Sequence, residues 1–326
     1  KLGNKGWSWK NVLPYFKKSE NYEPGENELH AQGGLLNVSK LRSPGSINDI
    51  FFEAARENQY KILDDLNGVV DGPDFEGMGY YDVTHKNGER WSTARAFLDT
   101  AIERSNLTVV THAHTEKVII EDNEAKLVRF NVKNKTNQIK ANKEIILSAG
   151  AFGSPQILLM SGIGPIDKLK PHGIEQVHEL PGVGENLQDH IDYVMGYNSN
   201  VKDNIGFSVM GTFRMIGEIY KYITKRRGMI TTNYAESGGY FYTDKSEPSP
   251  DIKLTFVRSA VDDHGRKLHL GHGYSCHTTV LRPKSRGSLW LNSSNPIDPP
   301  AIDPAFLEDE RDMETLFRGV KKTQSI

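Results

Sequence analysis

One short segment constrains the fold of this chain more than any other. Three apolar residues, Ile145, Ile146 and Leu147, lead into the sequence Ser-Ala-Gly-Ala-Phe-Gly-Ser-Pro at 148–155, and residues 156–160 are again largely apolar. This pattern predicts a buried strand, a tight turn and a helix. In an open α/β sheet, ligands bind where a strand ends, because backbone N–H groups of the turn and of the helix N-terminus are unpaired there. The turn is therefore the first candidate for a binding site.

Composition excludes several classes of protein. With 326 residues, 37% of them hydrophobic, the chain can bury the core of one large domain or of two ordinary ones. Its 40 basic and 42 acidic residues nearly balance, so we expect no nucleic-acid partner. The sequence has no run of about eighteen apolar residues, and we therefore predict no transmembrane helix.

Two further features bear on the cellular location. The single cysteine, Cys276, cannot form an internal disulfide, which is typical of a reducing compartment, so we expect a cytoplasmic protein. The chain starts at Lys1 without a methionine, and the sequence Gly-Trp-Ser-Trp at 6–9 does not look like a signal peptide. We interpret this start as lying inside a longer protein.

The spacing of apolar residues predicts a mixed α/β chain. Helical spacing predicts helices over 9–16, 46–54, 92–106 and 205–222. Alternating or β-branched runs predict strands over 107–111, 117–121, 125–132, 144–148, 234–242, 252–257, 275–281 and 287–291. The strand candidates after Gly184 are longer, which favours a second, more antiparallel domain.

Five segments carry a resemblance to one family. The run at 150–164, Gly-Ala-Phe-Gly-Ser-Pro-Gln-Ile-Leu-Leu-Met-Ser-Gly-Ile-Gly, resembles the second signature of the glucose-methanol-choline (GMC) oxidoreductases. Segments 6–20, 87–98, 180–190 and 281–287 resemble the same family in the same order. Segments 87–92, 235–239 and 263–267 look most like bacterial quinone-linked alcohol dehydrogenases, close to choline dehydrogenase-like proteins.

The resemblance implies a fold and a division of the chain. It implies an α/β (mixed α+β) fold in which residues 1–190 form a partial FAD-binding domain of Rossmann type, lacking its N-terminal dinucleotide-binding unit. Residues 191–300 would form a substrate-binding domain with an antiparallel sheet, and residues 301–326 would begin the return to the FAD domain. Because a sheet without its central strands exposes unpaired edges, we expect this chain to be unstable alone or to depend on a partner.

The resemblance also implies an activity. Members of the family use FAD to oxidise a primary alcohol to an aldehyde by hydride transfer while a base removes the hydroxyl proton. The implied partners are a small alcohol and a quinone or other electron acceptor. A dioxygen-using oxidase of the same family and a non-catalytic fragment or binding module are the alternatives. The alcohol, whether medium-chain, choline-like, sugar or aromatic, and the oligomeric state stay open.

The family pattern is incomplete in this sequence. The opening Gly-x-Gly-x-x-Gly motif, which holds the FAD pyrophosphate at a helix N-terminus, does not occur, and neither does the first family signature. The family's catalytic His and its His or Asn partner are expected beyond Ile326. We therefore predict no catalytic residue within this chain, and no activity for the chain in isolation.

Matched positions nominate the cofactor-binding residues. The resemblance places Thr115, in a loop before Lys117, where backbone atoms meet the FAD adenine. It places Ala149, Gly150 and Gly153 beside the adenosine half of FAD, since small residues let a nucleotide approach. The alternative is a tight strand-to-helix connection needed only for packing.

Two polar positions have both a structural and a functional interpretation. Asn186, with Asp189 and His190 after a glycine-rich turn, could cap a helix or support the flavin. Glu236 could face the substrate cavity, or it could be a salt-bridged or capping glutamate. A hydrogen-bonded structural role is the commoner one for a histidine such as His190.

Two other segments suggest additional binding. Nitrogen and sulfur ligands at His264, His269, His272, Cys276 and His277 suggest zinc, but their spacing fits no common zinc framework, so we predict no metal. The segment from Ile205 to Arg227 is apolar at helical spacing and ends in three basic residues. It is either a core helix or a peripheral membrane contact near lipid-soluble quinone, which would make the protein membrane-associated.

Overall fold

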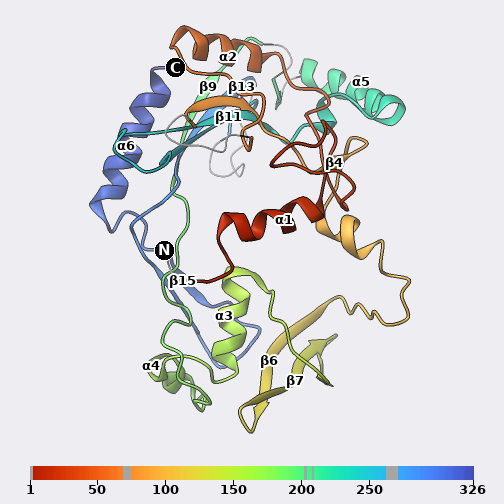
Figure 1. The fold of residues 1–326 in the computed structure, drawn as a ribbon, viewed down its shortest axis with the longest axis vertical. Coiled ribbons are helices and arrows are strands. Elements are labelled where there is room, and N and C mark those ends of the chain that lie inside the picture. The colour runs from red at the N-terminus through yellow and green to blue at the C-terminus, as the bar shows by residue number, and fades with distance from the viewer. Residues whose placement is uncertain (1–2, 69–74, 202–203, 208, 262–270) are drawn as a thin grey trace. The chain divides into compact units, whose positions relative to one another are not determined.

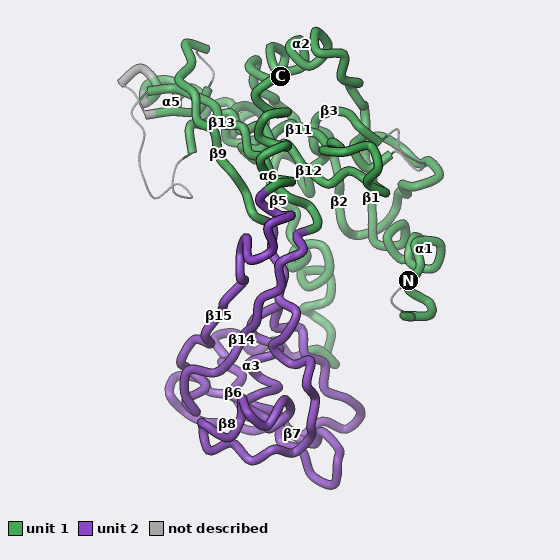
Figure 2. The backbone as a smooth tube through the Cα atoms, turned by 90° about the vertical axis from the view of Figure 1, so that its left-hand side faces the viewer, with its two compact units in different colours: residues 1–107, 191–282, 314–326 green, residues 108–190, 283–313 purple. Residues whose placement is uncertain are grey.

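A computed structural model describes residues 3–68, 75–201, 204–207, 209–261 and 271–326. The chain forms two compact units, and each unit consists of segments that are distant in the sequence. Unit 1 comprises Lys1–Leu107, Ile191–Arg282 and Glu314–Ile326, and unit 2 comprises Thr108–His190 and Pro283–Met313. Figure 1 gives the fold and Figure 2 colours the backbone by unit.

Unit 1 is built around an antiparallel sheet of six strands. The strand order is β10-β13-β12-β11-β3, and β9 pairs with β13. These strands are β3 (Gly77–Tyr80), β9 (Asp192–Asn198), β10 (Gly206–Phe207), β11 (Ala235–Phe241), β12 (Ile252–Val257) and β13 (Gly271–Val280). The antiparallel sheet expected after Gly184 is confirmed, and β11 and β12 follow the predicted ranges closely.

Helix α2 (Ile47–Glu57) covers one face of this sheet. Its Phe51 ring stacks on Phe256 of β12, with 4.5 Å between ring centroids. Phe241, Leu254 and Met78 of the sheet are buried in the same core. Burial of each such side chain contributes about 1.5–3 kcal/mol. The alternation of buried residues along β12 is what made this strand predictable from sequence.

Helix α6 (Glu310–Gln324) packs its C-terminal part on the same sheet. Leu316 contacts a second buried cluster that contains Ile252 and Val280. A Cβ atom at Gly319 would lie 2.6 Å from the Ile252 side chain, so glycine is needed for the close approach of helix and strand. The remaining helical elements of unit 1 are α1 (Trp9–Ser19), η2 (Ala94–Leu98), α5 (Val209–Lys225) and η4 (Met229–Thr231).

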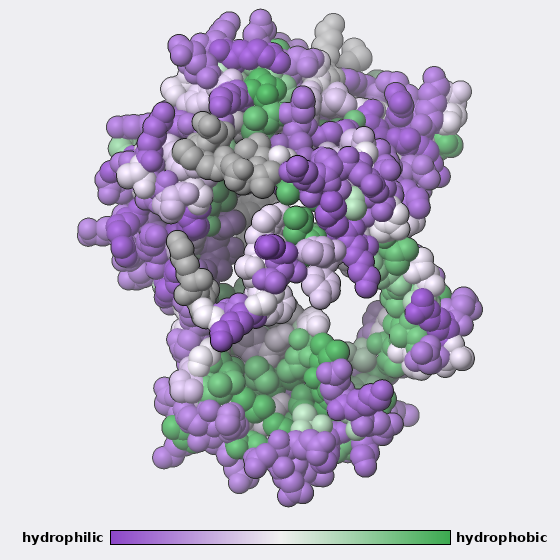
Figure 3. All heavy atoms as spheres, in the orientation of Figure 1, coloured by the Kyte–Doolittle hydropathy of each residue, from purple (hydrophilic) through white to green (hydrophobic). Residues whose placement is uncertain are grey.

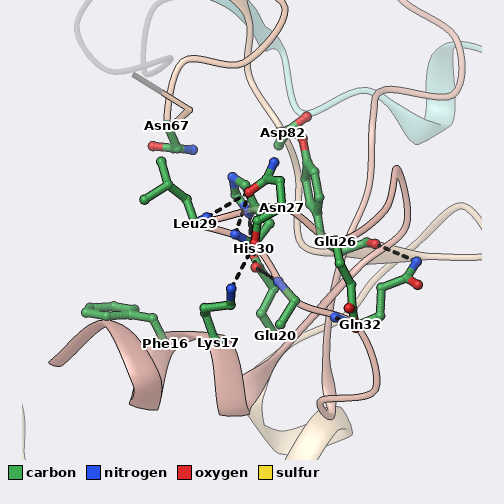
Figure 4. Close-up of polar contacts among 12 residues, drawn as sticks. Phe16, Lys17, Glu20, Glu26, Asn27, Leu29, His30, Gln32, Asn67 and Asp82 are labelled. Atoms are coloured by element: carbon green, nitrogen blue, oxygen red, sulfur yellow. Dashed lines mark hydrogen bonds and ion pairs between the residues drawn. The ribbon is translucent and has the colours of Figure 1, made fainter. Parts of the chain in front are cut away.

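Side chains fix the loop between two short parallel strands of unit 1, β1 (Glu20–Tyr22) and β2 (Leu36–Val38). Figure 4 shows His30 at the centre of these contacts. Its Nδ1 lies 3.0 Å from a Glu20 carboxylate oxygen, its Nε2 lies 3.0 Å from Asp65, and its ring stacks on Tyr22. Asn27 accepts two backbone N–H bonds from the same loop. Because both ring nitrogens of His30 are engaged, this cluster has a structural role.

Unit 2 contains a three-stranded antiparallel sheet and a helix that packs on it. The sheet order is β6-β7-β8, and its strands are β6 (Ala113–Glu121), β7 (Glu124–Val132) and β8 (Lys135–Lys140). Helix α3 (Gly150–Met160) ends at Ser161, whose Oγ accepts the Val118 N–H of β6 at 2.8 Å. The other elements are α4 (Ile166–Leu169), η3 (Lys170–His172), β14 (Ser288–Trp290) and β15 (Ala301–Asp303).

Three local predictions were wrong. Residues 107–111 and 144–148 form no strand, because no described segment pairs with their backbone groups and a strand needs such a partner. The expected buried strand at 144–148 is therefore an unpaired segment, with Ile146 75% exposed. The helix predicted over 92–106 is only the short π-type turn η2. There the Thr100 hydroxyl donates to the Phe97 carbonyl, which a continuing helix would use.

Candidate functional site

The glycine-rich turn at 149–153, which begins α3, is open on the described surface of unit 2. Gly150 has a φ of +81°, which favours glycine, and a Cβ atom added there would meet nothing within 4 Å. The Ala149 N–H donates to Ser154 Oγ at 3.0 Å, and this bond keeps the turn tight. Gly153 packs against Ala149, whose Cβ would lie 2.9 Å from a Cβ at position 153. The turn is thus compact internally and has free space outside it.

A pocket of about 420 Å³ adjoins this turn on one side of α3. Ala151, Ser154 and Leu158 of α3 form one wall, and the glycine-rich segment 180–187 forms the other, together with Leu289. Two segments singled out in the sequence, 150–164 and 180–190, therefore share one pocket. Figure 3 shows apolar residues gathered at the surface over α3, in the orientation of Figure 1.

The other nominated cofactor residues also lie in unit 2. Thr115 lies within β6 opposite Phe130, not in a loop, and next to a bulge that contains the buried Glu116. Asn186 is exposed, with a φ of +59°, and its neighbours Glu185 and Leu187 line the pocket beside α3. No described hydrogen bond joins Thr115 or Asn186 to the turn at 149–153. Asn186 therefore lies beside the pocket that adjoins the turn.

Asp189 and His190 do not form a catalytic pair among the described contacts. Both residues are exposed, and the Asp189 carboxylate accepts only the backbone N–H of His190, at 2.8 Å. Neither side chain caps a helix in the described structure, so the role of this pair stays a prediction.

Glu236 of β11 is the carboxylate of a buried ion pair in unit 1. It is 1% exposed, and Arg258, 3% exposed, donates to its Oε1 at 2.9 Å. The Thr232 hydroxyl donates to the same oxygen, while Oε2 accepts the Gly45 N–H and an Asn48 N–H. Both oxygens are engaged, so Glu236 is the salt-bridged glutamate of the two alternatives and not a group that faces a cavity.

A second and larger pocket, of about 1030 Å³, lies wholly within unit 1. Its walls come from residues 82–85, 88–90, Ser92, Arg95, Tyr222 of α5, Ile230 and residues 232–234. The hairpin of β4 (His85–Lys86) and β5 (Glu89–Arg90) is part of this wall. Sequence reasoning missed this pocket because its walls come from segments far apart in the chain, although segment 87–98 had been singled out.

His85 is the unusual side chain of this larger pocket. Its Nδ1 is buried and has no hydrogen-bond partner among the described residues. Burial first, and then the nearby Arg42 and Arg90 guanidinium groups, lower the pKa of His85. The imidazole is therefore held in its neutral form beside cationic side chains.

The histidine and cysteine cluster considered for zinc is only partly visible. His264 and His269 lie outside the described residues. His272 Nδ1 lies 2.8 Å from the Asn204 carbonyl oxygen, and His277 Nδ1 lies 2.6 Å from an Asp192 carboxylate oxygen. Burial raises the pKa of the Cys276 thiol to about 12. Within the described ranges, no three side chains of metal-binding type come together.

Comparison with known protein families gives two matches along the chain. Residues 1–192 match the N-terminal model of the GMC oxidoreductases, and residues 283–326 match the C-terminal model. The chain belongs to the GMC oxidoreductase family. The turn at 149–153, Thr115 and Asn186 all fall within the first match, whereas most of the six-stranded sheet lies between the two matches.

Relatives in this family include dehydrogenases. The chain is 40% identical over 327 residues to an alcohol dehydrogenase [acceptor] of Pseudomonas putida. This alignment covers 99% of the chain and 58% of that protein. It is 35% identical to the mitochondrial choline dehydrogenase of Homo sapiens, with 99% of the chain and 54% of that protein covered. The chain thus spans a little over half the length of these relatives.

Two proteins of known structure share this fold. Pyridoxine 4-oxidase from Mesorbium loti is 26% identical, with a TM-score of 0.82 over 99% of this chain and 59% of that one. An FAD-dependent oxidoreductase from Chaetomium thermophilum is 22% identical, with a TM-score of 0.85 over 99% of this chain and 64% of that one. The predicted mixed α/β fold is confirmed. Within the described residues, no helix is both long and apolar enough to cross a membrane.

Proposed function

We propose that the protein oxidises a primary alcohol to an aldehyde by hydride transfer to FAD, and passes the electrons to a quinone or another acceptor. The observation that carries this proposal is the open turn at 149–153, which lies inside the range matched by the family model. The names of the relatives support it, since one is an alcohol dehydrogenase and another acts on choline. FAD appears in the name of one structural neighbour.

The chemistry of the turn fits a nucleotide. Small residues and the open space around Gly150 allow close approach of an adenosine, and the first turn of α3 offers unpaired backbone N–H groups. We propose that Ala149, Gly150 and Gly153 contact the adenosine half of FAD, with Thr115 at the adenine and Asn186 nearby. When bound, the flavin would accept the hydride from the alcohol carbon.

Within this proposal, residues 1–190 serve flavin binding, 191–300 serve substrate binding, and 301–326 return to the flavin domain. The five proposed flavin-contacting residues all lie in unit 2, so the contact surface would belong to one compact unit. We assign the base that removes the hydroxyl proton to no residue of this chain.

Spectra and acceptor assays on the full-length protein test this proposal. We expect a flavin absorbance spectrum with one FAD per chain, and reduction of phenazine methosulfate with at least one alcohol among hexan-1-ol, choline, glucose and benzyl alcohol. Absence of bound flavin would contradict the proposal. Release of hydrogen peroxide in proportion to the alcohol consumed would instead support the dioxygen-using alternative, which the name of an oxygen-dependent choline dehydrogenase from Chromohalobacter salexigens also favours.

We further propose that α5 contacts an anionic membrane surface. Its apolar side chains recur at intervals of three and four residues and are exposed, with Phe213 and Ile223 each 69% exposed and Ile216 63% exposed. The exposed stripe supports a contact surface over the alternative of a core helix. Exposed basic residues, Lys225 and Arg227, follow at the end of the helix, where they could meet anionic headgroups.

Vesicle co-sedimentation tests the membrane contact. We expect the full-length protein to pellet at low salt with vesicles that contain phosphatidylglycerol, and the double substitution Ile216→Ser with Ile223→Ser to lower the affinity by more than about tenfold, because each buried isoleucine contributes about 1.5–3 kcal/mol. The matched control, Ile139→Ser with Ile297→Ser, changes isoleucines of similar exposure elsewhere. No pelleting at low salt, or a dimer that only the first variant dissociates, would contradict the proposal.

A further inference from the structure

The larger pocket of unit 1 contains an aromatic residue in a strained backbone conformation. Tyr234 has a φ of +65°, which is uncommon for a bulky residue, and its side chain is 54% exposed at the pocket wall. Such residues persist only where the surrounding structure enforces them, and they gather at binding sites. The strain at Tyr234 therefore calls for an explanation at this pocket.

Buried groups hold Tyr234 in this conformation. The Tyr234 N–H donates to Thr232 Oγ1 at 3.0 Å, and the Thr232 hydroxyl donates to Glu236. The Arg258 N–H donates to the Tyr234 carbonyl oxygen at 3.2 Å. Glu236, through Thr232, and the Arg258 backbone thus support the backbone on both sides of Tyr234, which lines the pocket.

The lining of the pocket carries two guanidinium groups and two carboxylates, and both carboxylates have cationic partners from outside the lining. Arg90 and Arg95 line it, and Glu89 is shared between Arg95 and Arg226, which lies 3.1 Å away. The carboxylate of Asp82 is already paired with Lys40 at 2.8 Å. A pocket of this kind favours ligands with oxygen acceptors and disfavours ammonium ligands such as choline.

The pocket also has apolar and aromatic walls. Tyr222 of α5 and Ile230 line it together with Tyr234. Aromatic walls combined with a few donors suit a planar ring that carries carbonyl oxygens.

We propose that this pocket binds the ring of a quinone electron acceptor. Tyr234 packs against the ring, and Arg90 and Arg95 donate to its carbonyl oxygens. This inference rests on the proposed function, which calls for an acceptor. Reduction of a quinone to a quinol takes two electrons and two protons, which is the number that oxidation of one alcohol to an aldehyde releases. Because Tyr222 belongs to α5, a lipid-soluble quinone would enter beside the helix proposed to contact the membrane.

Steady-state kinetics with decylubiquinone test this site in the full-length protein. Tyr234→Asn removes the ring without added strain, because asparagine tolerates a positive φ. We expect this variant and Arg90→Gln each to raise the KM for decylubiquinone about three- to tenfold, while the KM for the alcohol and the rate with phenazine methosulfate stay at wild-type values. The matched controls Tyr15→Asn and Arg104→Gln change exposed residues outside the pocket and should leave all three values unchanged.

A binding measurement separates this inference from the proposed function. Decylubiquinone should quench the intrinsic fluorescence of the protein saturably, since Trp91 lies between two pocket residues in sequence, and the two pocket variants should weaken this quenching by the same factor as the KM rises. If alcohol oxidation fails with every acceptor but saturable quenching remains, the proposed function fails and the site stands. Unchanged quinone KM and quenching in both pocket variants would overturn the site.

Discussion

Glu236 illustrates how a residue with functional appearance can be structural. Its four partners, Gly45, Asn48, Thr232 and Arg258, satisfy both carboxylate oxygens in the interior of unit 1. Such a pair contributes little when intact, but loss of one partner leaves a buried charge without compensation. The contribution of Glu236 is therefore to stability, and indirectly to the shape of the pocket wall at Tyr234.

We predict that Glu236→Gln destabilises the protein by about 3–5 kcal/mol, because Arg258 would remain charged in a buried position. Urea unfolding, followed by circular dichroism, measures this change. Glu314→Gln is the matched control, since the pair of Glu314 with Arg318 is on the surface and should contribute less than about 1 kcal/mol. Equal unfolding midpoints for Glu236→Gln and wild type would contradict the assigned role.

Cys276 should be unreactive in the native protein. Burial raises its thiol pKa to about 12, so the nucleophilic thiolate is nearly absent near neutral pH. We expect no reaction with Ellman's reagent at pH 8 under native conditions, and one reacting thiol per chain in urea. Because the pKa of the thiol is raised, the thiolate fraction grows as the pH rises toward about 12, and labelling should accelerate accordingly. Rapid labelling of the native protein at pH 8 would show that the thiol is accessible or activated.

The glycine-rich turn at the start of α3 is the element on which the proposed flavin contact depends. Gly150 and Gly173 both have a positive φ and open space where a Cβ atom would lie, yet only Gly150 lies at the proposed flavin contact. Substitution by alanine adds backbone strain at each position but no collision within the described structure. The two alanine variants therefore distinguish an effect on folding stability from an effect on FAD binding.

We predict that Gly150→Ala and Gly173→Ala each cost about 1–2 kcal/mol of stability, whereas only Gly150→Ala lowers the FAD content of the purified full-length protein. Thermal unfolding and the flavin-to-protein absorbance ratio measure the two effects. Equal FAD content in the two variants would indicate that the turn serves packing alone.

The spacing of apolar residues correctly predicted those helices and strands whose conformation depends mainly on their own residues. The alternating burial of β12 and the amphipathic pattern of α2 are visible in sequence, and both elements follow the predicted ranges closely. The apolar run at 144–148 gave the wrong prediction, because spacing cannot say whether a neighbouring strand is present to pair with it. For the same reason, helical spacing identified α5 without deciding whether its apolar face is buried or exposed.

At the scale of the whole molecule, contacts between distant segments define the units and the pockets. Unit 1 joins three stretches of the chain, and its sheet pairs β3 with β11, far along the sequence. The larger pocket likewise combines segments 82–95 and 222–234. No local pattern could predict these partners, whereas the turn at 149–153 was found because its whole signal lies in one short segment. Membership of the GMC oxidoreductase family was visible in sequence for the same reason.

Photolabelling with an azido-adenine analogue of FAD tests whether the adenosine of FAD contacts the turn at 149–153. If the adenosine of FAD lies against the turn, irradiation of the full-length protein with this analogue should attach the label to the peptide that contains residues 148–155, and excess FAD should prevent the labelling. Peptide mapping by mass spectrometry gives the position of the label. If FAD suppresses the labelling but the label lies neither in this peptide nor at Thr115, the adenosine of FAD does not lie against the turn.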